Sequence, residues 1–344
     1  MFTGLLFLSI HLSAQIPPGY YDAVAGLNGD TLRRVLHNII RDHQVQTYSS
    51  IWSHFQRTDR TPIGNVWDIY SDVPGGTPAY SYSFVVDQCG NYAKEGDCYN
   101  REHTVPASWF NNADTVYTDL FHIYPTDGFV NGKRSNYPFG EVANPSWTST
   151  NGSKLGNMIF PGYSGTVFEP IDEYKGDLAR TYFYMAVRYL NKLPSWSSPM
   201  FAGDSLTLWT KNLLLKWHYQ DTVSQKELNR NDSVYLIQDN RNPFIDHPEW
   251  VAAIWDKISS NPDQMSKPES SVTVACTNDA INIFNPDGLI LKISLFTVTG
   301  ARMLETVSIE KHLTLNPTLK PGIYILVLES PGGIRSVRKV VIAD

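Results

Sequence analysis

The chain has 344 residues, of which 42% are hydrophobic and 18% are charged. This apolar content can form a buried core and is too high for a disordered chain. The length exceeds the ~100 to 200 residues of a usual domain, so we expect a large body and a smaller module. The net charge of -6 argues against a strongly basic protein that coats nucleic acid, but it leaves room for a local basic groove.

The amino-terminal segment and the cysteines indicate the compartment. Residues 2–12 are apolar and small residues follow them, which predicts a cleaved signal peptide over residues 1–15; a buried helix is the alternative. No later stretch is long enough to span a membrane, so we expect an exported, soluble protein. Cys89 and Cys98 are expected to form a disulfide rather than two free thiols or a zinc pair, and Cys276 is left over.

Helical periodicity frames the large body, which we place at residues 16–257. Asp30 is expected to cap a first helix that ends near Ile40, and a second helix carries Ile51, Trp52 and Phe55 on one face. Short extended pieces and polar loops follow over residues 65–165, where we expect the site. Helices are predicted again over residues 177–190, 206–217, 224–234 and 248–255.

A linker and a β-rich module complete the chain. Residues 258–271 have no apolar period and contain Pro, Ser, Asn and Lys, as linkers do. Residues 272–344 consist of short β-type runs separated by Gly, Pro and Asn turns, which predicts a small immunoglobulin-like β-sandwich. The fold class is therefore α+β, a helix-rich body followed by an all-β module.

Two polar segments carry the candidate chemistry: NREHTVPASWF at residues 100–110 and TDLFHIYPTDGFVNGKRSNYPFG at residues 118–140. Phosphodiester hydrolysis needs an activated water and stabilisation of the phosphate charge and of the leaving oxygen. A neutral histidine, a divalent cation held by a carboxylate and one further N or O ligand, and an arginine supply these. Glu102, His103, His122 and Arg134 match this set.

These two segments resemble the signature of the endonuclease I family, secreted or periplasmic nucleases with a ββα-metal (His-Me) finger. The resemblance extends over residues 19–255, through GYYDAVAGLNGDTLRRVLHNII, FEPIDEYKGDLARTYFYMAVRY and the block at residues 213–250. It implies a metal-dependent, non-specific endonuclease that cleaves DNA, and it leaves RNA open as a further substrate. It further implies one Mg²⁺ per site, with Mn²⁺ or Ca²⁺ as substitutes, and no small organic cofactor.

By this resemblance, His103 is the general base and Glu102 a metal ligand. His122 falls at the position of a second metal ligand, at the start of the finger helix; a core histidine bonded to a carbonyl is the alternative. Arg134 would take phosphate charge as a catalytic residue. Nucleic-acid contacts are expected from Arg101, Asn131, Lys133 and Asn136. For Asp119, we favour a structural helix cap over a role in orienting a ligand.

The module at residues 272–344 is similar to the sorting domains of type IX secretion substrates in Bacteroidetes-type bacteria, on the runs LKISLFTVTGARMLET and LKPGIYILVLESPGGIRSVRKVVIAD. This implies contact with secretion machinery and export through the periplasm and outer membrane, to the medium or the cell surface. We expect a monomer. Two other functions stay open: a non-catalytic surface protein that binds DNA or polysaccharide, and a phosphoesterase acting on small nucleotides.

Overall fold

A computed structural model describes most of the chain, namely residues 16–112, 114–255, 272–276, 280–286, 288–289, 291–316, 319–329 and 335–342. The predicted signal peptide at residues 1–15 and the predicted linker at residues 258–271 lie outside the described residues. No helix in the described ranges is long and apolar enough to cross a membrane.

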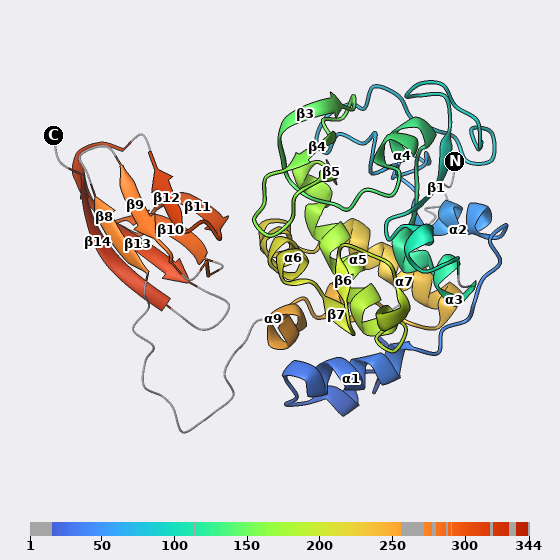
Figure 1. The fold of residues 1–344 in the computed structure, drawn as a ribbon, viewed down its shortest axis with the longest axis horizontal. Helices are drawn as coiled ribbons and strands as arrows, with labels where there is room; N and C mark the ends of the chain where they lie inside the picture. The colour runs from blue at the N-terminus through green and yellow to red at the C-terminus, as the bar shows by residue number, and fades with distance from the viewer. Residues whose placement is uncertain are drawn as a thin grey trace, which may run out of the picture.

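The large body is rich in helices, as the periodicity predicted (Figure 1). They are α1 (Gly29–Ile40), α2 (Ile51–Thr58), α3 (Asp114–Tyr117), α4 (Gly128–Arg134), α5 (Lys175–Arg188), α6 (Leu208–Gln220), α7 (Gln225–Gln238), α8 (Pro243–Asp246) and α9 (Glu249–Trp255). The cap expected at Asp30 is wrong: Asn28 precedes α1, and the Asp30 carboxylate accepts hydrogen bonds from Arg33 and Arg34 instead. Ser224 caps α7 in a reciprocal capping box with Glu227.

Small antiparallel sheets lie among these helices. Strands β1 (Tyr99–His103) and β2 (Ile123–Asp127) form one pair. Strands β3 (Val142–Thr148), β4 (Lys154–Met158) and β5 (Thr166–Glu169) form a three-stranded sheet, and β6 (Phe201–Ala202) pairs with β7 (Ser205–Leu206). The body is thus mixed helix and sheet, in agreement with the α+β prediction.

The carboxy-terminal region is all β in the parts that the structure describes, as predicted. Its strands are β8 (Thr273–Cys276), β9 (Ile281–Phe284), β10 (Leu291–Thr297), β11 (Arg302–Ser308), β12 (His312–Leu315), β13 (Gly322–Glu329) and β14 (Arg335–Ile342). They form a sheet in the order β11-β10-β13-β14 and a second one in the order β12-β9-β8. Side chains from both sheets, including Ile283, Leu295 and Leu326, share one apolar core.

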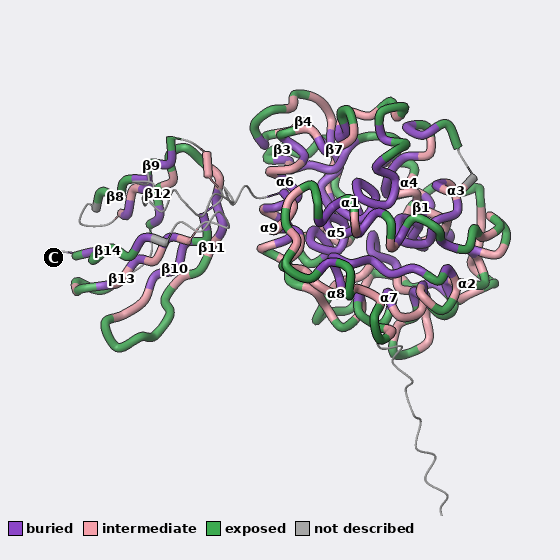
Figure 2. The backbone as a smooth tube through the Cα atoms, turned by 90° about the horizontal axis from the view of Figure 1, so that it is seen from below, coloured by how far each residue is buried: buried purple, intermediate pink, exposed green. Residues whose placement is uncertain are grey.

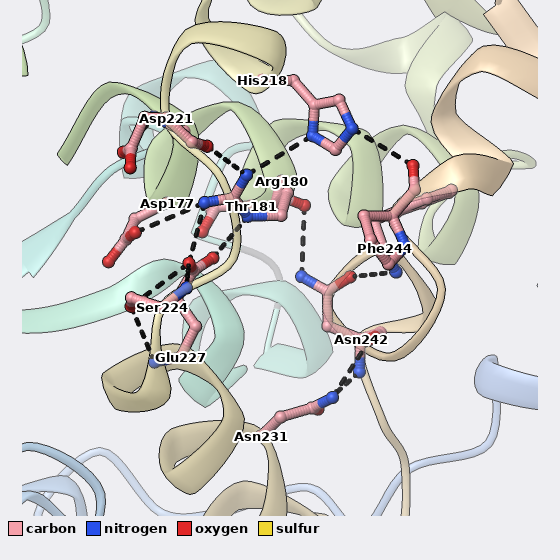
Figure 3. Close-up of polar contacts among 12 residues, drawn as sticks. Asp177, Arg180, Thr181, His218, Asp221, Ser224, Glu227, Asn231, Asn242 and Phe244 are labelled. Carbon is pink, nitrogen blue, oxygen red and sulfur yellow. Dashed lines mark hydrogen bonds and ion pairs between the residues drawn. The ribbon is translucent and has the colours of Figure 1, made fainter. Parts of the chain in front are cut away.

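Helix α5 is the centre of the large body, because every one of its residues is buried (Figures 1 and 2). A helix that is buried on all sides must satisfy its polar side chains internally. Arg180 does so with its guanidinium, which donates to Glu227 Oε2 at 2.7 Å and to the Asp221 carbonyl at 2.8 Å (Figure 3). Its own backbone carbonyl accepts from the Asn242 amide at 3.1 Å. This network ties α5 to α7 and α8.

We expect Arg180→Met to destabilise the large body by about 3–5 kcal/mol, because it leaves Glu227 buried without its cation. Burial and then the Asp177 carboxylate raise the pKa of Glu227, against the effect of Arg180. Urea unfolding followed by tryptophan fluorescence measures this, since all 9 Trp lie within residues 52–255. The control is Arg34→Met, which removes an exposed ion pair with Asp30 and should cost under about 0.5 kcal/mol. Equal losses would contradict the role of Arg180.

The predicted disulfide between Cys89 and Cys98 is present. It closes a loop that carries Tyr92, whose ring lies against Gly128 and Gly132 of α4. A Cβ at Gly128 would come within 2.5 Å of that ring, so the close contact requires glycine there. The disulfide thus fixes a loop that packs on α4.

Candidate functional site

The two polar segments meet in one supersecondary unit, two antiparallel strands followed by a helix. His103 pairs with Ile123 at one end of the β1–β2 ladder, and Tyr99 pairs with Asp127 at the other. The Asp127 carboxylate then caps α4, accepting from the Val130 amide at 2.8 Å. Helix α4 packs against both strands.

The expected position of His122 at the start of the finger helix is wrong. His122 ends a 3-10 turn, Leu120–His122, and β2 follows directly. Pro125 lies within β2 and has no N–H to continue a helix. Asp119 is a structural cap, as we favoured, but of this 3-10 turn: its carboxylate accepts from the Phe121 amide at 3.0 Å.

Glu102 and His103 contact different neighbours, as adjacent residues on a strand should. The Glu102 side chain is buried; its Oε1 accepts from the Tyr70 hydroxyl at 2.9 Å and forms an ion pair with Arg134 Nη1, also at 2.9 Å. Burial raises the pKa of Glu102 to about 7, while the Arg134 charge acts against this rise. A second cation beside this carboxylate would favour its ionised form.

Arg134 joins Glu102 to the end of β1. Besides its ion pair, the buried guanidinium donates to the His103 carbonyl at 2.7 Å and to the Thr104 carbonyl, and it lies 4.6 Å from the Phe139 ring centroid. Its Nε is buried and has no hydrogen-bond partner in the described part of the chain. Arg134 therefore holds the backbone of the candidate base in place with most of its donors already used.

His103 is half-buried, and one of its two ring nitrogens is engaged. Its Nε2 lies 2.9 Å from the Tyr117 carbonyl oxygen. A carbonyl can only accept, so Nε2 carries the hydrogen and Nδ1 keeps the lone pair. Burial, followed by the neighbouring His122, lowers the pKa of His103 to about 3. The imidazole is thus neutral, and Nδ1 carries its lone pair without a proton.

His122 has the same arrangement and is fully buried. Its Nε2 lies 2.6 Å from the Val116 carbonyl oxygen, and its ring centroid lies 5.4 Å from that of His103. Burial lowers its pKa to about 4. The Nδ1 atom is buried with no partner among the described residues. A buried nitrogen lone pair without a donor is suited to a metal ion or a water molecule.

The donors fit a divalent cation in their chemistry. Glu102 offers a carboxylate and His122 an unpartnered Nδ1, and both donor types bind Mg²⁺- or Mn²⁺-like ions. No described contact joins these two side chains to each other. No group of three or more His, Cys, Asp or Glu residues that could hold a metal occurs within the described ranges. The sequence predicted an ion held by two protein ligands and several waters. Such a site has fewer protein ligands than a group of three.

The residues expected to contact nucleic acid differ in their surroundings. Arg101 lies against the rings of Tyr48 and Trp52 and does not extend freely into solvent. Lys133 of α4 is half-buried, with its ammonium 5.1 Å from the Phe129 ring centroid. Asn131 is half-buried on α4, whereas Asn136 is exposed beyond its end.

Sequence reasoning missed the residues that orient the candidate catalytic groups. Tyr70 is 32 residues from Glu102, in a segment with no motif of its own. The acceptors for His103 and His122 are main-chain carbonyls of Tyr117 and Val116. Every residue type has a backbone carbonyl, so the sequence carries no signal for these contacts.

The family model for endonuclease I matches residues 28–249, well over half of the chain. The chain belongs to the endonuclease I family. The matched range contains the β1–β2–α4 unit and helix α5, so this family membership covers both the candidate site and the buried core.

Curated relatives of this endonuclease I family chain have nuclease names. An extracellular ribonuclease of Bacillus amyloliquefaciens is 36% identical over 263 residues, covering 71% of this chain and 82% of that protein. An extracellular ribonuclease of Bacillus subtilis (strain 168) is 34% identical, covering 69% of this chain and 78% of that protein. A periplasmic deoxyribonuclease of Aeromonas hydrophila is 28% identical over 129 residues, which is 37% of this chain and 47% of that protein. Family and names together support an endonuclease.

Proposed function

We propose that this chain is a metal-dependent, non-specific endonuclease that hydrolyses phosphodiester bonds in DNA and also in RNA. The observation that carries the proposal is the His103 imidazole, whose Nε2 bonds to the Tyr117 carbonyl at 2.9 Å and whose Nδ1 is left as a base. Relatives named ribonuclease and deoxyribonuclease support both nucleic acids as substrates.

In this mechanism, His103 Nδ1 accepts a proton from the water that attacks phosphorus, and Tyr117 keeps the ring oriented while it becomes an imidazolium. Glu102 and His122 are the proposed ligands of one divalent cation, Mg²⁺ or a substitute. When bound, such an ion would stabilise charge on the phosphate and on the leaving oxygen. Arg134 holds Glu102 and the His103 carbonyl, and we propose that its positive charge also favours the anionic phosphate.

We further propose that Asn131, Lys133 and Asn136, on and just after α4, contact the sugar-phosphate backbone. Helix α4 ends at Arg134, so its last turn carries two cations beside the candidate site. Contacts to phosphates carry no base information, which is consistent with non-specific cleavage.

We propose that the protein is exported from the cell. The relatives include extracellular and periplasmic nucleases, which supports secretion. We propose that residues 1–15 act as a signal peptide and that the carboxy-terminal β region engages secretion machinery at the outer membrane. The immunoglobulin-like topology of that region, its sorting role and the monomeric state stay predictions.

The direct test is cleavage of supercoiled plasmid, linear single-stranded DNA and RNA with and without Mg²⁺. We expect nicked plasmid first and then fragments without a fixed sequence, in the presence of the ion. A small nucleotide phosphodiester serves as the comparison substrate. Hydrolysis of the small ester alone would favour the phosphoesterase, and binding of DNA without any cleavage would favour the non-catalytic protein.

A further inference from the structure

One face of β1 carries Tyr99, Arg101 and His103, because side chains alternate along a strand. The rings of Trp52 and Tyr48 lie against this face. The Trp52 ring lies 5.4 Å from the Tyr99 ring and 4.3 Å from the Arg101 guanidinium. The Tyr48 ring lies 3.6 Å from the same guanidinium and is stacked near the His103 ring, with centroids 5.9 Å apart.

Arg101 is fixed by these contacts. Its Nη1 donates to the Tyr48 carbonyl at 2.8 Å, while its plane interacts with the two rings. Its Nε is buried and has no partner in the part of the chain that the structure describes. The guanidinium therefore binds both the backbone and the ring of Tyr48.

Tyr48 also contacts Tyr117, which lies against the candidate base. Its ring centroid lies 4.6 Å from that of Tyr117. Tyr117 in turn stacks on His103, with centroids 4.6 Å apart, and its carbonyl accepts the His103 Nε2 hydrogen. Two rings and one carbonyl thus restrict the plane and the tautomer of the imidazole.

We propose that Arg101 and Tyr48 are positioning residues, which hold Tyr117 and through it the His103 ring, so that Nδ1 stays directed at the attacking water. This inference rests on the proposed function of His103. It replaces the phosphate contact that the sequence suggested for Arg101, because its guanidinium is already engaged by Tyr48 and Trp52.

A positioning role of Arg101 can be distinguished from a phosphate contact by measuring the turnover, the Michaelis constant and its dependence on salt. We expect Arg101→Met and Arg101→Lys each to lower kcat by about 10- to 100-fold, since misplaced groups cost rates of that order. Lysine keeps the charge but loses the planar, bidentate group. The Michaelis constant and its dependence on salt should stay as in the unchanged enzyme.

A phosphate contact predicts the opposite pattern. The Michaelis constant would rise for Arg101→Met, the slope of log affinity against log salt would fall by about one, and Arg101→Lys would restore the rate. That pattern would overturn the inference. Lys133→Met is the positive control for a phosphate contact, since we place Lys133 against the sugar-phosphate backbone.

A second pair of variants replaces Tyr48 and leaves Arg101 in place. Its outcome therefore does not depend on how the Arg101 substitutions affect folding. Tyr48→Phe keeps the ring and the carbonyl and should retain most of kcat, whereas Tyr48→Leu should lose about as much as Arg101→Met. The double variant Arg101→Met/Tyr48→Leu should lose little more than either single variant, because both act on the same contact. Urea unfolding identifies any variant whose body is unstable.

The proposed nuclease function and the positioning role of Arg101 and Tyr48 are contradicted by different results. An unchanged enzyme that cleaves no nucleic acid would remove the proposed function. An active enzyme in which Arg101→Met, Arg101→Lys and Tyr48→Leu all keep the full kcat would overturn the positioning role alone.

Discussion

Replacing His103 with alanine is expected to lower plasmid cleavage by about 10²- to 10⁴-fold, the usual contribution of a general base. The reason is its geometry: the Nε2 hydrogen is held by the Tyr117 carbonyl, so Nδ1 is available for the proton of the attacking water. Because Glu102 and Arg134 contact each other without the imidazole, the variant should still bind metal and DNA.

The measurement is single-turnover cleavage with enzyme in excess, together with DNA binding in Ca²⁺ or without metal. His247→Ala is a matched control, since that histidine stacks on Trp250 and is not among the proposed site residues. Full activity of the His103→Ala enzyme would mean that another group activates the water. Loss of activity together with loss of DNA binding would point to a binding role in place of base catalysis.

Removal of divalent cations with EDTA is expected to abolish cleavage, and added Mg²⁺ or Mn²⁺ should restore it. Glu102→Gln should then raise the metal concentration needed for half-maximal activity by about 10- to 100-fold or more. Loss of an outer-shell partner already costs that much affinity, and Glu102 is proposed as a direct ligand. Its buried carboxylate has one cationic neighbour, Arg134, and a raised pKa of about 7.

Glu169→Gln is the matched control for this variant. Glu169 is also a buried carboxylate with a cationic partner, since Lys175 Nζ donates to it at 2.7 Å, and it lies on β5 outside the proposed site. A metal titration of both variants distinguishes a ligand from a general loss of stability. Cleavage that continues in EDTA, or equal metal requirements of both variants, would contradict the ion at Glu102.

The sequence predicted those features that depend on periodicity or on residue type. Apolar spacing located α1, α2, α5, α6, α7 and α9, and the short β-type runs located the all-β carboxy-terminal region. The Glu102–His103 pair was found because it lies in the segment NREHTVPASWF, which resembles the family signature. Cys89 and Cys98 are close in sequence and form the expected disulfide.

Features that depend on tertiary contacts could not be predicted in this way. The spacing of Asp119 and His122 fits a 3-10 turn as well as the first turn of a helix, and β2 follows where we expected the finger helix. From the sequence, we expected Arg101 to contact nucleic acid. Only the folded chain brings Tyr48 and Trp52, about fifty residues earlier in sequence, against its guanidinium.

The central claim is that one divalent cation bound by Glu102 and His122 lies next to the Nδ1 atom of His103. Anomalous diffraction from crystals of the full chain grown with Mn²⁺ tests it most directly. We predict one manganese peak within bonding distance of the Glu102 carboxylate and of His122 Nδ1. A manganese ion bound by other residues, with Glu102 held only by Tyr70 and Arg134, would contradict the claim.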